Sequence, residues 1–195
     1  MSIFLDDAEL RTESWQRRHS PEAIAQLGVW RWKGIQQYAG KILDLICGKR
    51  VIDFGGFDGP LGFGSIVVDQ KAEYKTLADV PGDVDVIFSS HTLEHLDYPR
   101  RWMREACGRL VSDGLLILHV PSWTCKRWRA GEYSNPNQPN GHKWTFCLNK
   151  DWRDTPNDMD GTIIDITVGK HHAGFDVELA EYVGDNSILL IARKP

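Results

Sequence analysis

The sequence contains no hydrophobic run of the roughly 18 residues that a membrane-spanning helix needs, and it has no internal repeat or low-complexity tract. Its first residues turn acidic at once, without the basic start of a secretion signal. Positive charge is not in excess either: 23 Lys and Arg stand against 27 Asp and Glu, a formal net charge of −4. We therefore expect a cytoplasmic protein that binds no membrane and does not use nucleic acid as its partner.

Cysteine is scarce, whereas tryptophan is abundant. The four cysteines are widely spaced and form no CxxC pair, so we expect reduced thiols. The 8 tryptophans among 195 residues exceed what a core requires, and aromatic surfaces often serve ligand binding. With 42% hydrophobic and 26% charged residues, the composition is that of one ordinary globular domain.

The chain divides into a polar N-terminal arm at residues 1–19 and a single domain at 20–195. Ser20-Pro21-Glu22 is a helix-start signal, and Gly48 is a helix-stop signal, so a helical cap is expected over 20–48. The segment 122–146 is rich in Asn, Pro, Gly and Trp and is predicted to be a loop.

Short apolar runs separated by helical or polar segments predict an α/β fold. Clear strands are expected at 51–54, 65–68, 84–88, 115–120, 175–183 and 187–192, with a weaker candidate at 74–80. Gly184-Asp185-Asn186 indicates a hairpin between the last two. An amphipathic helix begins near Asp97 and Pro99. The pattern predicts a Rossmann-like, open, mostly parallel seven-stranded sheet with an antiparallel C-terminal hairpin.

Four segments should meet at the carboxyl ends of the parallel strands, where ligands bind in such sheets. They are residues 53–59, Asp69, residues 89–95 and the loop after Val120. The glycines of the first segment would let backbone N–H groups approach a ligand closely. Asp69, at a strand end, suits the two hydroxyls of a ribose.

These residues resemble the core of class I S-adenosylmethionine-dependent methyltransferases of the small-molecule type. Asp53-Phe54-Gly55-Gly56-Phe57-Asp58-Gly59 is similar to the first motif of that family. The run VDVIFSSHTLEHLDYPRRWMREACGRLVSDGLLILHVP at 84–121 is similar to the rest of the core, and the match covers about residues 45–122. The resemblance implies a methyltransferase that uses S-adenosylmethionine and releases S-adenosylhomocysteine.

The resemblance also implies the residues of the cofactor site. Gly55 and its neighbours would lie under the methionine, Asp69 would hold the ribose and Asp79 would accept from the adenine amino group. Residues 89–91 would line the cofactor near the sulfonium. The full expected set is Asp53, Gly55, Gly56, Phe57, Gly59, Asp69, Asp79, Ser89, Ser90 and His91.

Two features depart from the family pattern. Phe57 stands where the DxGxGxG motif has its middle glycine, so its ring must turn away from the cofactor or shrink the site. Asp53, Asp69 and Asp85 are spaced 16 residues apart, which is too short for the helices that these intervals usually hold. We therefore expect the two early helices to be shortened or lost, which would leave a thinner wall over the adenosine.

Methyl transfer is an in-line displacement that depends mainly on positioning, although an oxygen or nitrogen nucleophile can need a base. Histidine suits that task near neutral pH. His95 is the first candidate because it begins a helix at the ligand edge, and the other catalytic candidates are His91 and Glu94. An equally weighted alternative is that His95 only orders its loop. His119, inside a strand, is expected to be structural.

The loop at 122–146 mixes aromatic and basic residues, which suits stacking on a ring while neutralising an anionic group. The expected substrate-contacting residues are Trp123, Arg127, Trp128, His142 and Trp144. The alternative is a solvated basic loop whose tryptophans pack on the domain. Trp30 and Trp32 would form the opposite wall or simply cover the sheet. The acceptor is expected to be a polar small molecule, a sugar or an anionic metabolite.

Other functions fit the same residues less well. The acids between 151 and 160 lack a calcium-loop pattern, and no metal is assigned. A metal-assisted RNA methyltransferase is an alternative because His91, Glu94, His95 and His142 resemble part of the Glu/His cluster of small-RNA 3′-end methyltransferases. A non-catalytic member of the fold is another. A nicotinamide dehydrogenase is disfavoured by Leu93-Glu94-His95 and the closing hairpin. The oligomeric state is left open.

Overall fold

A computed structural model describes residues 28–125, 141–153 and 161–195. They form a central six-stranded sheet with strand order β2-β1-β3-β4-β8-β7 and a separate pair, β5 and β6. The predicted arm at 1–19 lies outside the described residues. The strands are β1 Val51–Phe54, β2 Ile66–Val68, β3 Val84–Ser90, β4 Leu110–Pro121, β5 Thr145–Cys147, β6 Gly161–Ile163, β7 Asp176–Val183 and β8 Ser187–Arg193.

The topology confirms the α/β prediction. β2, β1, β3 and β4 pair in parallel, whereas β8 pairs antiparallel with both β4 and β7. The predicted hairpin around Asp185 is therefore present. The predicted strand count was wrong, because the main sheet has six strands and not seven. Of the weak candidate at 74–80, Tyr74 makes only an isolated bridge with Val68, and a short 3₁₀ turn follows.

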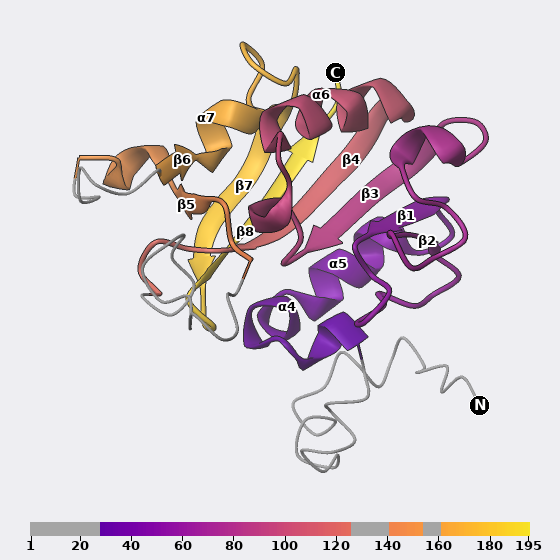
Figure 1. The fold of residues 1–195 in the computed structure, drawn as a ribbon, viewed down its shortest axis with the longest axis horizontal. Helices are drawn as coiled ribbons and strands as arrows, with labels where there is room; N and C mark the ends of the chain where they lie inside the picture. The colour runs from indigo at the N-terminus through magenta and orange to yellow at the C-terminus, as the bar shows by residue number, and fades with distance from the viewer. Residues whose placement is uncertain (1–27, 126–140, 154–160) are drawn as a thin grey trace.

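Helices cover both faces of the sheet (Figure 1). α4 and α5 lie on one face, below the sheet in this view, and α6 and α7 lie on the other, above it. The helices and turns are η1 Gly28–Arg31, α4 Lys33–Gln37, α5 Ala39–Ile46, η2 Leu77–Asp79, η3 Leu93–His95, α6 Pro99–Arg109, η5 Asn149–Asp151 and α7 Ile164–Val168.

Two apolar layers follow from the alternation of side chains along the strands. In β3, Val86 and Phe88 face the layer that contains Ile42 and Ile46 of α5, while Ile87 faces the layer that contains Met103 of α6. α5 presents Ile42, Leu43 and Ile46 at helical spacing. The central strands are buried on both faces, as their near-continuous apolar sequences predict.

The early connections depart from the family pattern as predicted. In the described chain, no α-helix lies between β1 and β2, and only the 3₁₀ turn η2 lies between β2 and β3. The first interval contains five glycines and Pro60, which disfavour a helix. It is held from the N-terminal side instead, since the backbone N–H of Val29 donates to Pro60 and the indole N–H of Trp30 donates to the Leu61 carbonyl.

Among the helices of the described residues, none has the length and hydrophobicity that a membrane crossing demands.

The close packing of α4 against the β7–β8 turn gives a test of the fold. A Cβ atom on Gly34 would lie 2.4 Å from Val183 Cγ2 and 2.8 Å from Asp185 Oδ1, whereas a Cβ on Gly40 meets nothing within 4 Å. We expect Gly34→Ala to destabilise the protein by about 1–3 kcal/mol through overpacking. Gly40→Ala should stabilise it by about 0.5–1 kcal/mol. Urea unfolding followed by tryptophan fluorescence measures both, and equal stabilities would contradict this packing.

Candidate active site

A cavity of about 340 Å³ lies at the carboxyl ends of β1, β2 and β3. One wall comes from the turns that follow these strands, and the other comes from η1 and the residue that follows it. The structure thus brings together Gly55, Gly59, Asp69, Ser90, His91 and His95 of the predicted site. The full lining is Val29, Arg31, Trp32, Gly55, Asp58, Gly59, Asp69, Ser90, His91, Thr92 and His95.

The glycine-rich turn after β1 is tightly packed from below. Gly55 has a φ of +82° and donates its N–H to the Val68 carbonyl, and a Cβ there would lie 2.0 Å from Thr92 Oγ1. A Cβ on Gly56 would lie 2.0 Å from Asp53 Oδ2. Both positions therefore require glycine because neighbouring side chains occupy the space beneath the turn.

Asp53 supports this turn from inside the protein. Its side chain is buried, it does not line the cavity, and Oδ2 accepts a hydrogen bond from the Leu61 N–H at 2.7 Å. Burial raises the pKa of Asp53 to about 7, and the charge of Asp69 adds to the rise, although the Leu61 hydrogen bond opposes it. Asp53 therefore positions the loop and does not line the site.

Phe57 points outward. Its side chain is 47% exposed, is absent from the cavity lining, and has Lys71 Nζ 5.7 Å from the ring centroid. The sequence left two possibilities for Phe57, a ring that turns away or a ring that shrinks the site. The structure shows the first, so Phe57 takes no space from the cavity.

The acidic residues after β2 divide into two roles. Asp69 lines the cavity, and its Oδ1 accepts from the Lys71 N–H at 2.9 Å, which holds the carboxylate at the strand end. Asp79 is exposed and outside the lining. Its Oδ2 accepts from the N–H groups of Lys75 and Thr76, and these hydrogen bonds lower the pKa of Asp79. Asp79 thus caps η2 and is not placed to meet a ligand in this cavity.

The two serines at the end of β3 point to opposite faces, as strand geometry demands. Ser89 is buried and donates to the Phe54 carbonyl, outside the cavity lining. Ser90 lines the cavity, and its hydroxyl lies 2.9 Å from His119 Nδ1.

His119 belongs to a buried network behind the cavity. Its Nε2 lies 3.2 Å from Asp185 Oδ2, which also accepts the Gly34 N–H at 3.0 Å. Burial lowers the pKa of His119. Burial also pushes the pKa of Asp185 up, but hydrogen bonds from His119, Gly34 and Ser187 bring it below its ordinary value. A neutral His119 donating to an ionised Asp185 can accept the Ser90 hydroxyl at Nδ1. The structural role predicted for His119 agrees with this network.

Trp32 and His91 meet across the cavity lining. Their rings stack with centroids 4.3 Å apart and planes 8° apart. The guanidinium carbon of Arg31 lies 5.4 Å from the centre of the Trp32 ring, and Arg31 also lines the cavity. Trp30 is buried and covers the sheet, so Trp30 and Trp32 take different roles. Arg31, Asp58 and Thr92 were not among the predicted site residues, although all lie within or beside the quoted segments.

Glu94, His95 and His142 form a cluster beside the cavity. One carboxylate oxygen of Glu94 and one ring nitrogen of each histidine lie within 4.8 Å of one another. Glu94 is fully buried, and neither of its oxygens has a hydrogen-bond partner. Oε1 lies 3.5 Å from His91 Nδ1, 4.0 Å from His95 Nε2 and 3.9 Å from His142 Nε2. Three of the predicted catalytic and substrate residues thus meet at one point.

Two of the predicted substrate tryptophans, Trp123 and Trp144, pack on the domain. Trp123 donates its indole N–H to the Tyr182 hydroxyl, and Trp144 donates to the Leu96 carbonyl. Neither lines the cavity, and nor does His142. Arg127 and Trp128 lie outside the described residues. The alternative expectation, in which the tryptophans of this segment cover the domain, fits Trp123 and Trp144.

Comparisons with known proteins agree with the predicted class. Residues 61–118 match the family described as a methyltransferase domain. An S-adenosylmethionine-dependent methyltransferase from Mesorhizobium loti superposes with a TM-score of 0.52 at 14% identity, over 83% of this chain and 98% of that one. A candidate methyltransferase from Bacillus halodurans gives 0.50 at 16% identity, over 80% and 96%. No curated protein sequence matches.

A third structure is a chain of the complex between the Haloferax volcanii Trm112 methyltransferase activator and a candidate methyltransferase. It gives a TM-score of 0.50 at 12% identity, over 94% of this chain and 95% of that chain. At these identities the structures show the fold, which is that of class I methyltransferases. Together with the domain match, they confirm the predicted resemblance and support an S-adenosylmethionine-dependent methyltransferase.

The raised pKa of Asp53 predicts a pH-dependent stability. Because the folded-state pKa of about 7 exceeds the model value of 3.8, the folded state holds the proton more tightly, and stability falls as pH rises between these values. Each pH unit costs about 1.4 kcal/mol, so from pH 5 to pH 8 the native protein should lose about 2–3 kcal/mol more than Asp53→Asn.

Urea unfolding at several pH values measures this difference. Asp176→Asn, at an exposed position on β7, serves as the control and should follow the native protein. Identical pH profiles for the native protein and Asp53→Asn would contradict a buried proton on Asp53.

Proposed function

We propose that this protein transfers a methyl group from S-adenosylmethionine to a polar small molecule bound in the same cavity. The observation that carries the proposal is the cavity itself. Gly55, Asp69 and Ser90 meet there at the ends of three neighbouring parallel strands. Its volume falls in the ordinary range of small-molecule sites.

The donors on the cavity wall suit the parts of the cofactor. Asp69 is the carboxylate for the two ribose hydroxyls, since it lines the cavity at the end of β2. Gly55 and Gly59 leave backbone exposed beneath the methionine portion, with no side chain to block it. Ser90 and His91 line the same cavity. The bound cofactor supplies a methyl group activated by a positively charged sulfur.

The acceptor would lie toward His91 and His95. Among the described residues, Arg31 is the one lysine or arginine that lines the cavity, and it suits an anionic group on a small molecule. Trp32 offers a flat face beside it. An oxygen or nitrogen acceptor must lose a proton as it is methylated, and His95 is the exposed imidazole at this end, with Glu94 and His91 behind it.

Cofactor binding tests the proposal. We expect S-adenosylhomocysteine to bind the full chain with micromolar Kd by calorimetry. Asp69→Ala should weaken binding about 10- to 100-fold, because a hydrogen bond to a charged group contributes about 1.5–3 kcal/mol. Asp176→Ala removes an exposed carboxylate away from the cavity and should bind as the native protein does.

Melting temperatures of the two variants confirm that both remain folded. The absence of binding by the native protein at millimolar ligand, or unchanged binding by folded Asp69→Ala, would contradict the proposed site.

A further inference from the structure

We propose that Glu94, His95 and His142 bind a divalent transition-metal ion at the edge of the cavity. No metal was assigned from the sequence, where these three residues and His91 entered only the alternative of a metal-assisted RNA methyltransferase. The fold brings the three side chains to one point. Binding of the ion does not depend on the proposed methyl transfer.

The buried carboxylate of Glu94 is the main reason to place a metal ion at this cluster. Its carboxylate is completely buried, and both oxygens lack a hydrogen-bond donor. Within the described chain, no lysine or arginine forms an ion pair with it. The ionisable groups nearest to Oε1 are three imidazoles, whose ring nitrogens lie 3.5–4.0 Å away. A buried carboxylate in this state is costly unless a cation or strong donors compensate it. A metal ion among these groups would provide that compensation.

The imidazole of His95 is oriented as a ligand. Its Nδ1 lies 3.1 Å from the Gly141 carbonyl, which can only accept, so Nδ1 carries the proton. Nε2 is thereby left facing Glu94 at 4.0 Å. Metal-bound histidines commonly donate their second ring N–H in this way, which fixes both tautomer and ring orientation.

The three ligand atoms need to move only slightly closer together to bind one ion. Ligand atoms around a tetrahedral zinc lie about 3.3 Å apart, since each bond is about 2.0–2.2 Å. Glu94 Oε1 is 4.0 Å from His95 Nε2 and 3.9 Å from His142 Nε2. Side-chain movements of less than about 1 Å would bring these atoms to bonding positions around one ion.

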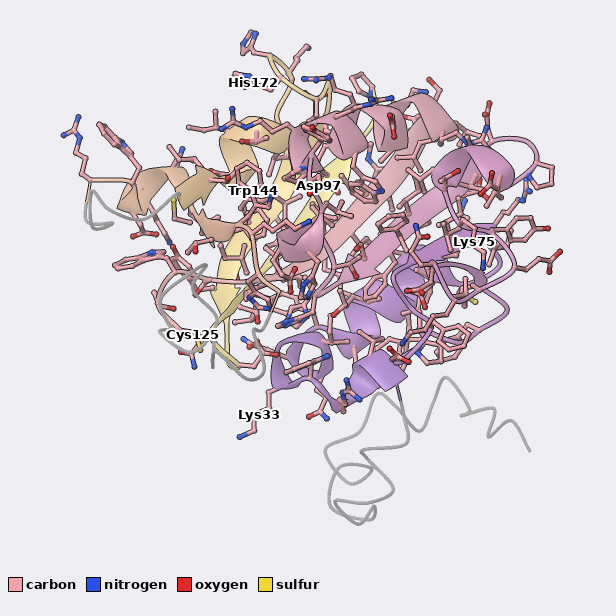
Figure 2. The ribbon with its side chains drawn as sticks, in the orientation of Figure 1. Lys33, Lys75, Asp97, Cys125, Trp144 and His172 are labelled. Atoms are coloured by element: carbon pink, nitrogen blue, oxygen red, sulfur yellow. The ribbon has the colours of Figure 1, made fainter. Side chains whose placement is uncertain are left out.

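The two segments that carry the ligands are fixed to each other. The Lys143 N–H donates to the Glu94 carbonyl at 2.7 Å, and the Trp144 indole donates to the Leu96 carbonyl. Lys143 also pairs with Asp97 at 2.6 Å. Figure 2 shows Asp97 and Trp144 side by side where these segments meet. The backbone on both sides is thus held before any ion binds, which favours a preformed site.

The ligand set selects the kind of ion. Two imidazoles and one carboxylate form three-ligand zinc sites and also suit cobalt, iron or manganese, whereas calcium and magnesium prefer oxygen alone. Three protein ligands leave at least one position for another oxygen. His95 is the ligand that lines the cavity and is partly exposed, so this position would face the acceptor end. Hydroxyl or carboxylate oxygens of a small molecule would suit it.

Cobalt titration of the chelator-treated full chain tests the site. We expect one equivalent of Co²⁺ to give visible d–d absorption, with micromolar or tighter Kd, and stoichiometric Zn²⁺ to displace it. Glu94→Gln and His142→Ala should each weaken binding at least 100-fold. His172→Ala, which alters an exposed histidine outside this cluster, should bind as the native protein does.

The four free cysteines are the competing ligands, and cobalt–thiolate charge-transfer absorption would reveal them. That absorption, the absence of binding at 1 mM Co²⁺, or unchanged binding by folded Glu94→Gln would each overturn the proposal. So would binding of Mg²⁺ in preference to Zn²⁺. S-adenosylhomocysteine calorimetry is performed separately on metal-free protein, so failure of the methyltransferase proposal and failure of the metal site are distinguishable.

Discussion

The parallel pairing of β1 with β3 is the constraint on which the site depends. Its register sets Phe54 opposite Ser89, so both strands end at one edge. The glycine turn after β1 therefore lies beside Ser90 and His91 at the end of β3. The Phe54 carbonyl accepts a hydrogen bond from the Ser89 hydroxyl at this edge. A shift by one residue would exchange the two serines between the cavity and the core. The cavity residues that follow β1 and β3 rely on this alignment.

The lost early helices are compensated by the N-terminal cap. Trp30 and Val29 hydrogen-bond to the 55–65 turn, and Gly28 packs so closely on Pro60 that a Cβ would lie 2.2 Å from its carbonyl oxygen. The same η1 segment supplies Arg31 to the cavity, and Trp32 follows it. One element thus replaces the wall that an early helix would provide and contributes side chains for a ligand. The shortened fold has in this way gained a different cavity wall.

The sequence predicted the fold better than it predicted the individual site contacts. Apolar runs located the strands. Because strand ends follow from this local periodicity, Asp69 and Ser90 could be predicted to line a cavity at the edge of the sheet. Asp53 and Asp79 illustrate what periodicity does not reveal: both carboxylates are turned to backbone N–H groups. Likewise, no spacing rule connects His142 with Glu94, since a segment distant in the sequence returns there only in the folded chain.

Among the described residues, Asp53, Asp185 and Glu94 are carboxylates removed wholly or largely from solvent, and the way each is compensated sets Glu94 apart. Asp53 accepts the Leu61 N–H and has its pKa raised to about 7, so a proton can neutralise it. Asp185 is ionised and receives donors from His119 and Gly34. Within the described chain Glu94 has no hydrogen-bond partner and no lysine or arginine beside it, only imidazoles of which His91 Nδ1 is nearest at 3.5 Å, although it is the most deeply buried of the three. Because Asp53 and Asp185 are compensated within the protein and Glu94 is not, a ligand is the natural partner for Glu94, and the surrounding imidazole nitrogens make a metal ion the ligand that fits their chemistry.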